Sequence, residues 1–263
     1  GVKAVMERPE PDGAIVLGAH MEAPFLAEAK AGAQLKQYFA DPNEENWQRY
    51  TCGLESVVRL ITMAPERAGA LAFISALTKK GITVSIGHTT ADAETTHAAA
   101  EAGATHVTHT FNAQTPLNHR APGVPGAALV DDRLQCEVIS DGIHLHPDIV
   151  KLIIRTKGKE KLVAITDAME AAGMPDGQYQ LGGQEVFVHE GAARLKDGTL
   201  AGSTLTMVRA FQNLMRFGAT PEEAALMTTK TPALSIGNEE LGEIELGAPA
   251  IFSRFDENYA FKG

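Results

Sequence analysis

The sequence predicts an α/β fold made of repeated strand–helix units, as found in barrels and doubly wound sheets. Six apolar, β-branched runs begin near residues 15, 57, 82, 104, 134 and 161, and most are separated by stretches of helical character. These units show no internal sequence repeat. The chain has 263 residues, of which 44% are hydrophobic, so it is long enough for one large domain with a substantial core.

The first half of the chain is expected to alternate strands with helices after a short helix end and a loop. In order, we expect a strand at 15–20, a helix at 43–50, a strand at 57–63 and an amphipathic helix at 67–80. Pro24 ends the first strand, because proline cannot donate to a sheet ladder. Glu22 is therefore placed at the carboxyl edge of that strand.

Residues 81–109 form the most informative stretch, since two apolar runs in it each end close to a histidine. A strand at 82–86 leads to His88, a helix at 93–102 can be capped from the stretch 89–92, and a strand at 104–108 leads to His109. Such a βαβ unit places its strands in parallel, so both histidines emerge at the carboxyl edge. A single histidine at a strand end is more often structural, but two in register favour a transition-metal site.

The second half begins with a Gly/Pro-rich loop at 112–126 that carries Arg120. We then expect a strand at 134–140, a helix at 147–156, and a strand at 162–166 that ends at Asp167. Residues 173–202 hold seven glycines and short strands, with Asp197-Gly198 as a hairpin turn. Helices follow at 203–217, capped by Ser203, and at 221–230, begun by Pro221. The tail at 242–261 is typical of a small β appendage.

Composition narrows the classes of function. The net charge of −10 disfavours nucleic acid and anionic membranes as partners, although a local arginine could still bind an anionic substrate. No apolar run approaches 18 residues, and the opening lacks the pattern of a signal peptide. Cys52 and Cys136 have no companion cysteines, which argues against disulfides and thiolate clusters and favours a reducing cytoplasm.

Glu22, His88 and His109 together make a His₂Glu set, which recurs in catalytic zinc sites that leave one position open. A metal there would lower the pKa of water and so supply a nucleophile near neutral pH. Asp167, at the end of the last strand, is suited to act as the general base. The alternative for Asp167 is a helix N-cap, which is a common role for aspartate after a strand.

An ordered set of motifs resembles the N-acetylglucosamine-6-phosphate deacetylase family of the metal-dependent amidohydrolase superfamily. The motifs are Gly87-His88-Thr89, Thr108-His109-Thr110-Phe111-Asn112-Ala113, Asp141-Gly142-Ile143-His144, Thr166-Asp167-Ala168 and Leu200-Ala201-Gly202-Ser203. His20-Met21-Glu22-Ala23-Pro24-Phe25 is also similar to the family's His-x-Glu-Gly-Pro-Phe motif. The resemblance covers essentially the whole chain, and the set is more specific than any one motif.

The resemblance implies a TIM-like (β/α)8 barrel over residues 1–235 and a remnant of a small β-sandwich domain at 236–263. It implies Glu22, His88 and His109 as ligands of a divalent ion, most simply zinc, with Asp167 as general base and then acid. It implies substrate contacts from Ala33, Asn112, Ala113, Arg120, His144, Leu200, Ala201 and Gly202, with Arg120 on the sugar phosphate. The resemblance also implies that the protein is a cytoplasmic homodimer and that it hydrolyses the acetamide of the sugar phosphate.

The chain also departs from the family pattern. It lacks the first two barrel strands, roughly 60 residues at about 30 per unit, which the family uses for a His-x-His pair. We therefore expect either a fragment of a longer protein or a partner that covers the open edge. Gln34 replaces a histidine thought to polarise the acetamide carbonyl, Ala23 replaces a glycine, and Gln114 replaces a methionine.

Two other functions remain open on the sequence alone. The first is a related amidohydrolase that acts on another amide or a cyclic imide, against which Arg120 and Asn112 argue. The second is a non-catalytic remnant that binds a sugar phosphate. The missing strands and Gln34 favour this alternative. The presence of all three ligand candidates and Asp167 argues against the remnant. The sequence does not separate N-acetylglucosamine from its galactosamine epimer, because loop geometry reads that hydroxyl.

Overall fold

The computed structural model describes residues 1–9, 13–248 and 250–263. The chain forms two compact units, Gly1–Leu134 and Gln135–Gly263. Within each unit, parallel strands are followed by helices, which confirms the α/β prediction. The expected appendage at 236–263 stays a prediction, because this division falls elsewhere in the chain.

The first unit carries four parallel strands in the order β1-β2-β3-β4. These strands are β1 (Ala19–Met21), β2 (Val58–Met63), β3 (Thr83–Ile86) and β4 (His106–Val107). Its helices are α1 (Val2–Glu7), α2 (Glu44–Thr51), α3 (Ala70–Lys79), α4 (Ala93–Glu101) and α5 (Gly123–Val130). Short 3-10 helices are η1 (Glu28–Lys30), η2 (Lys36–Tyr38) and η3 (Glu55–Val57).

Side-chain caps mark where two helices of this unit, α2 and α4, begin. Asn43 accepts a hydrogen bond from the backbone N–H of Asn46 at the start of α2, and Asp92 accepts one from Thr95 at the start of α4. The predicted cap within 89–92 is therefore confirmed, and Asp92 is the residue that provides it. Helix α3 begins at Ala70, three residues later than expected, because Gly69 adopts a left-handed conformation with φ of 82°.

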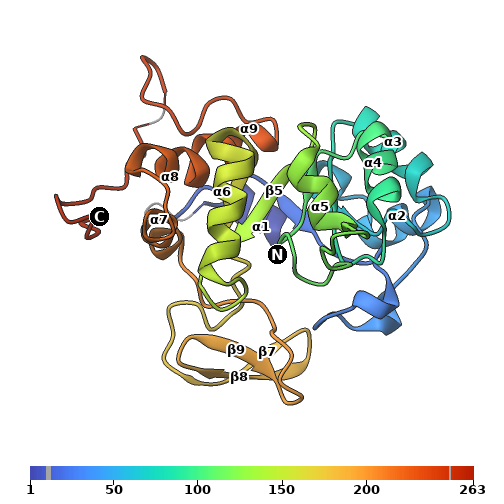
Figure 1. The fold of residues 1–263 in the computed structure, drawn as a ribbon. Coiled ribbons are helices and arrows are strands. Elements are labelled where there is room, and N and C mark those ends of the chain that lie inside the picture. Colours follow the sequence, from blue (N-terminus) through green and yellow to red (C-terminus); the bar gives the residue numbers. More distant parts are fainter. Residues whose placement is uncertain (10–12, 249) are drawn as a thin grey trace. The chain divides into compact units, whose positions relative to one another are not determined.

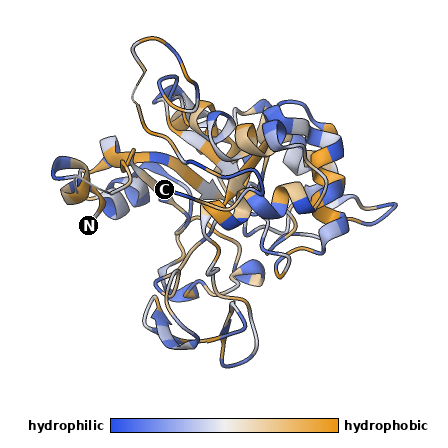
Figure 2. Cartoon of the chain, turned by 90° about the vertical axis from the view of Figure 1, so that its left-hand side faces the viewer, coloured by the Kyte–Doolittle hydropathy of each residue, from blue (hydrophilic) through white to orange (hydrophobic). Residues whose placement is uncertain are grey.

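Apolar side chains of β2, β3 and α3 make the core of the first unit. Ile61, Met63, Ile74, Leu77 and Ile86 have no exposed surface. Phe25 and Trp47 each pack edge-on against Phe73, with ring centroids 5.6 and 6.5 Å apart. Figure 2 shows the same pattern as apolar residues along the strands and mixed apolar and polar faces on the helices.

The second unit contains a parallel pair and a separate antiparallel sheet (Figure 1). The parallel pair is β5 (Gln135–Ile139) and β6 (Leu162–Ile165), and the antiparallel order is β7 (Gly177–Leu181), β8 (Gln184–His189) and β9 (Ala192–Leu195). Its helices are α6 (Pro147–Lys161), α7 (Met207–Arg216), α8 (Pro221–Thr228) and α9 (Lys230–Ser235). Ile139, Leu205 and Ala210 form a buried cluster.

Several boundaries differ from the sequence prediction. Helix α5 lies where part of the 112–126 loop was expected, since its Gly/Pro-rich start hides a buried apolar turn. The first strand begins at Ala19 instead of residue 15, and β4 keeps only two residues. Thr206, not Ser203, caps α7, because the Ser203 hydroxyl bonds the Thr166 carbonyl oxygen instead. Pro221 does open α8, with Thr220 in a capping box.

The remaining predictions concern a turn, the last stretch, the cysteines and the length of the helices. Asp197-Gly198 turns the chain between β9 and Leu200, which pairs antiparallel with Arg194. Within the described part of 236–263, an isolated antiparallel bridge joins Phe255 and Phe261. Cys52 is exposed and Cys136 is buried, and no disulfide joins the two. Each helix in the described ranges is too short or too polar to cross a lipid bilayer.

Candidate metal centre

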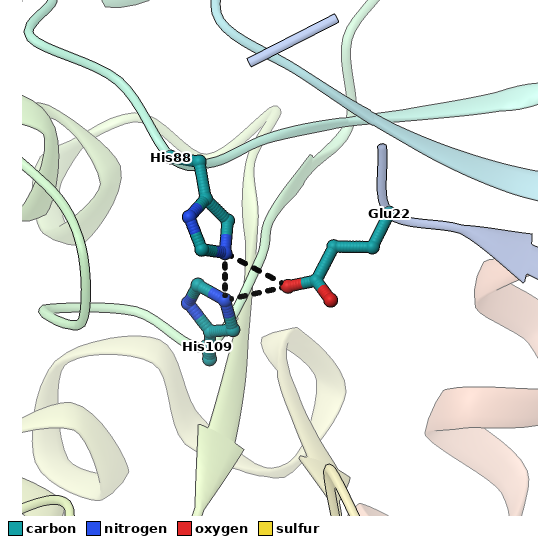
Figure 3. A group of neighbouring side chains, drawn as sticks. All are labelled: Glu22, His88 and His109. Atoms are coloured by element: carbon teal, nitrogen blue, oxygen red, sulfur yellow. Dashed lines mark hydrogen bonds and ion pairs between the residues drawn. The ribbon is translucent and has the colours of Figure 1, made fainter. Parts of the chain in front are cut away.

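Strand register brings three of the predicted site residues together in the first unit. Ile86 pairs with Val107 in the parallel β3–β4 ladder, so His88 and His109, each two residues further on, leave the same edge side by side. Glu22 follows β1 directly and reaches the same place. Figure 3 shows the three side chains pointing toward one another. The expectation that these strand ends meet is therefore confirmed.

The three side chains converge on a common point. The Nε2 atoms of His88 and His109 each lie 2.9 Å from Oε1 of Glu22 and 3.0 Å from one another (Figure 3). Both histidines are 5% exposed, whereas the Glu22 side chain is 26% exposed. The set thus presents two imidazole nitrogens and one carboxylate oxygen, with access from one side.

The donor set fits a divalent metal ion. His88 Nδ1 lies 2.7 Å from the Lys30 carbonyl oxygen, so Nε2 is the ring nitrogen that faces Glu22. Burial would raise the pKa of Glu22, but hydrogen bonds from His109 and His88 and their charge hold it well below its usual range. An ionised carboxylate beside imidazole nitrogens is the donor chemistry of zinc and related ions.

Both histidines sit in left-handed backbone conformations. The φ angles are 47° at His88 and 30° at His109, and Phe111 and Ala113 follow at 79° and 49°. Residues with a Cβ avoid this region, so each costs on the order of 1–3 kcal/mol and needs support from its surroundings. Such residues cluster at functional sites in proteins, which supports a role for this strand edge.

Three further side chains hold a ligand candidate or the turn next to one. The sequence analysis did not assign any of the three to the site. The Gln34 amide donates to Glu22 Oε2 at 2.8 Å. Buried Gln114 donates to the Thr108 carbonyl oxygen and accepts from the Phe111 N–H. These two hydrogen bonds tie together both sides of the turn that carries His109. Glu66 accepts hydrogen bonds from the Thr89 hydroxyl and from the N–H and hydroxyl of Thr90, just after His88. Gln34 and Gln114 stood out in the sequence only as departures from a pattern.

The remaining candidates of the first unit lie on loops near these ligands. Asn112 bonds the His109 carbonyl oxygen through its backbone N–H at 2.9 Å and its amide at 3.1 Å. The Ala113 carbonyl oxygen accepts from the Thr89 N–H, so the two histidine loops are joined. Ala33 is half-buried next to Gln34, and Arg120 is exposed. Their predicted contacts with substrate stay predictions.

The second unit brings Asp167 together with the 200–203 segment. Asp167 follows β6 with φ of 49°, and its carbonyl oxygen accepts from the Ser203 N–H at 2.7 Å. A Cβ on Gly202 would lie 3.1 Å from the same oxygen, so the glycine permits this approach. Leu200 is half-buried and Ala201 is fully buried.

His144 is fixed by Asp141 in the same unit. Its Nδ1 lies 2.7 Å from Asp141 Oδ2, and both side chains are less than a tenth exposed. Burial would raise the pKa of Asp141, but the hydrogen bond from His144 and its charge keep it below the usual value. The pair leaves Nε2 of His144 as the ring atom available for a ligand.

The chain belongs to the amidohydrolase family, whose model matches residues 1–261. It is 39% identical over 251 residues to N-acetylglucosamine-6-phosphate deacetylase of Lysinibacillus sphaericus, covering 95% of this chain and 65% of that protein. It is 40% identical over 240 residues to N-acetylgalactosamine-6-phosphate deacetylase of Escherichia coli O157:H7, covering 90% of this chain and 63% of that protein. The chain therefore spans somewhat less than two thirds of these curated relatives.

Solved structures agree with this placement. A mutant N-acetyl-D-glucosamine-6-phosphate deacetylase from Mycobacterium smegmatis, in complex with N-acetyl-D-glucosamine-6-phosphate, is 36% identical with a TM-score of 0.90. The match covers 99% of this chain and 68% of that one. The enzyme of the same name from Thermotoga maritima is 33% identical, also with a TM-score of 0.90, covering 98% of this chain and 69% of that one.

Proposed function

We propose that this chain takes part in the metal-dependent hydrolysis of the acetamide of N-acetylglucosamine 6-phosphate, giving glucosamine 6-phosphate and acetate. The observation that carries the proposal is the convergence of Glu22, His88 and His109 on one point at the carboxyl edge of parallel strands. The names of the relatives supply the substrate class. Retention of the three ligand candidates and Asp167 argues for catalysis over mere binding.

The metal ion would be held by Glu22 Oε1 and the Nε2 atoms of His88 and His109, and zinc suits this set best. When bound, such an ion supplies Lewis acidity that polarises a carbonyl and lowers the pKa of water. Asp167 would accept the proton of the attacking water as its oxygen joins the acetyl carbon. The same carboxyl group would then protonate the amine as the C–N bond breaks, so that acetate and the free amine leave.

Binding energy away from the reacting carbonyl would come from loop residues. The Arg120 guanidinium can hold a sugar phosphate bidentately, and His144 has its orientation set by Asp141. We propose backbone contacts to the sugar from Ala33, Ala113 and the 200–202 segment. For the whole protein, we propose a (β/α)8 barrel, a homodimer in which Arg120 acts at the neighbouring active site, and a cytoplasmic location, which the low cysteine content supports.

N-acetylgalactosamine 6-phosphate is the second candidate substrate. The Escherichia coli relative that carries this name is as similar to the chain as the glucosamine-named relatives. The two sugars differ in one hydroxyl, so the reaction and the proposed ligands are the same for both. Rates on the two sugars, measured side by side, decide between them.

Acetate release from N-acetylglucosamine 6-phosphate by zinc-loaded protein tests the proposal. We expect release that a chelator abolishes and zinc restores, and that falls by at least about 10³-fold in His109→Ala and Asp167→Asn, since both would remove parts of the reacting set. His189→Ala, which removes an exposed histidine from β8, is the matched control and keeps full activity. Zinc binding without turnover of any N-acetyl sugar phosphate would contradict the proposal and favour a binding remnant or another amide.

A further inference from the structure

The carboxylate of Glu22 has both oxygens assigned to different partners. Oε1 faces the two histidine Nε2 atoms, whereas Oε2 accepts a hydrogen bond from the Gln34 amide at 2.8 Å. The amide therefore contacts the oxygen that points away from the imidazole pair. This contact defines which carboxylate oxygen is presented to the histidines.

The contact with Gln34 restricts the Glu22 side chain beyond its contacts with the two histidines. It is 26% exposed and leaves the chain just after the short strand β1, which is only three residues long. A glutamate side chain loses rotamer entropy when it is fixed, and a hydrogen bond to an ionised acceptor is among the stronger ones available to offset that cost. An amide N–H does not titrate, so it can donate this hydrogen bond at every working pH.

The segment that carries Gln34 also holds a second ligand. The Ala27 N–H donates to the His88 carbonyl oxygen at 2.9 Å, and the Lys30 carbonyl oxygen lies 2.7 Å from His88 Nδ1. The segment of residues 27–34 therefore fixes two side chains. One is the ring of His88, which follows β3, and the other is the carboxylate of Glu22, which follows β1. Partners outside the ligand set commonly tune metal affinity by orienting the ligands.

We propose that Gln34 is a positioning residue of the metal centre, which holds Glu22 in the orientation that binds the ion. This role differs from the one the family pattern implies for the position, where a side chain polarises the acetamide carbonyl. The inference rests on the proposed metal site. It predicts that the Gln34 amide acts on metal affinity before any substrate is present.

The test compares zinc affinities of the whole chain, measured by competition with a chromophoric chelator. We expect Gln34→Leu, which keeps the size but loses the donor, to bind Zn²⁺ about 10- to 100-fold more weakly. Gln37→Leu is the matched control, because Gln37 is an exposed glutamine of η2, and its affinity stays at the wild-type value. Gln34→His retains an N–H donor and is expected to recover most of the lost affinity.

Two further readouts separate positioning from a general loss of structure. The thermal midpoint of the metal-free protein is expected to fall by only about 2–4 °C in Gln34→Leu, because a single part-buried hydrogen bond is lost. The visible spectrum of the Co²⁺-loaded protein, which reports ligand geometry, is expected to change in Gln34→Leu and not in Gln37→Leu. Together these would show a change at the ion and not in the fold.

The results that would overturn the inference are distinct from those that would overturn the proposed function. Equal zinc affinity in wild type and Gln34→Leu would overturn the role of Gln34 while leaving the metal site intact. That role would also be overturned if Gln34→Leu lost metal-free stability in step with affinity, or if Gln34→His bound as weakly as Gln34→Leu. A wild-type chain that bound no zinc would instead refute the proposed metal site, and the inference with it.

Discussion

Replacing Gln114 with methionine should destabilise the first unit although the two side chains have nearly the same volume. Gln114 is only 4% exposed and makes two hydrogen bonds to the backbone of the turn that carries His109. Its Oε1 accepts from the Phe111 N–H at 3.0 Å, and its Nε2 donates to the Thr108 carbonyl oxygen at 2.8 Å. Methionine fills the space and supplies neither partner.

The expected cost follows from the two backbone groups that lose their partner. A buried donor or acceptor left unsatisfied costs about 1–3 kcal/mol, so the pair should cost about 3 kcal/mol after partial relaxation. The turn cannot relax easily, because His109, Phe111 and Ala113 are already held at positive φ. For a protein of this size, about 3 kcal/mol lowers the thermal midpoint by roughly 6–12 °C.

Fluorescence of Trp47 provides the assay, because it is the only tryptophan and lies fully buried in the same unit. Urea unfolding of wild type, Gln114→Met and the exposed control Gln37→Met gives the three free energies of unfolding. We expect the control within about 0.5 kcal/mol of wild type, as is usual for surface substitutions. If Gln114→Met were as stable as the control, the turn would not depend on this side chain and the reasoning would be wrong.

Two other changes test the first unit. Gly32→Ala and Gly53→Ala both place a Cβ at positive φ and should each cost about 1 kcal/mol. The Cβ at Gly32 would lie 3.4 Å from His88, which is an ordinary contact, so zinc affinity should stay at the wild-type value in both variants. Asp131→Asn tests the low pKa of the Asp131 carboxyl group. Hydrogen bonds from Arg133 lower this pKa well below its usual value, although burial acts in the opposite direction. The ionised carboxylate therefore stabilises the fold above about pH 4, and this contribution is lost as the pH falls further. The free energies of unfolding of wild type and Asp131→Asn should differ at pH 7 and converge in acid.

The sequence was sufficient to predict the elements that carry the proposed metal ligands. Strong β-branched runs identified β2, β3 and β5, and the parallel βαβ unit alone placed His88 and His109 at one edge. These features are local or follow from chain topology. The stretch 89–92 caps α4 as expected for the same reason.

What sequence reasoning missed depends on contacts between distant segments. Gly123–Val130 forms α5 because seven of its eight residues are buried, although its two glycines and proline are poor helix formers. Glu66 reaches Thr89 across 23 residues, which no local pattern indicates. Ser203 was expected to cap a helix, but the folded chain offers its hydroxyl a closer acceptor at Thr166.

Two of the ligand candidates, His88 and His109, lie at positions where the backbone is strained. His88 and His109 hold left-handed conformations at strand ends, and neighbouring segments fix them through Lys30, Glu66 and Gln114. Because these hydrogen bonds are made within the protein, the strain is offset when the chain folds and not when an ion binds. The free energy of metal binding is then available for holding the ion, and a variant that loosens one of these bonds should weaken binding without altering any ligand atom.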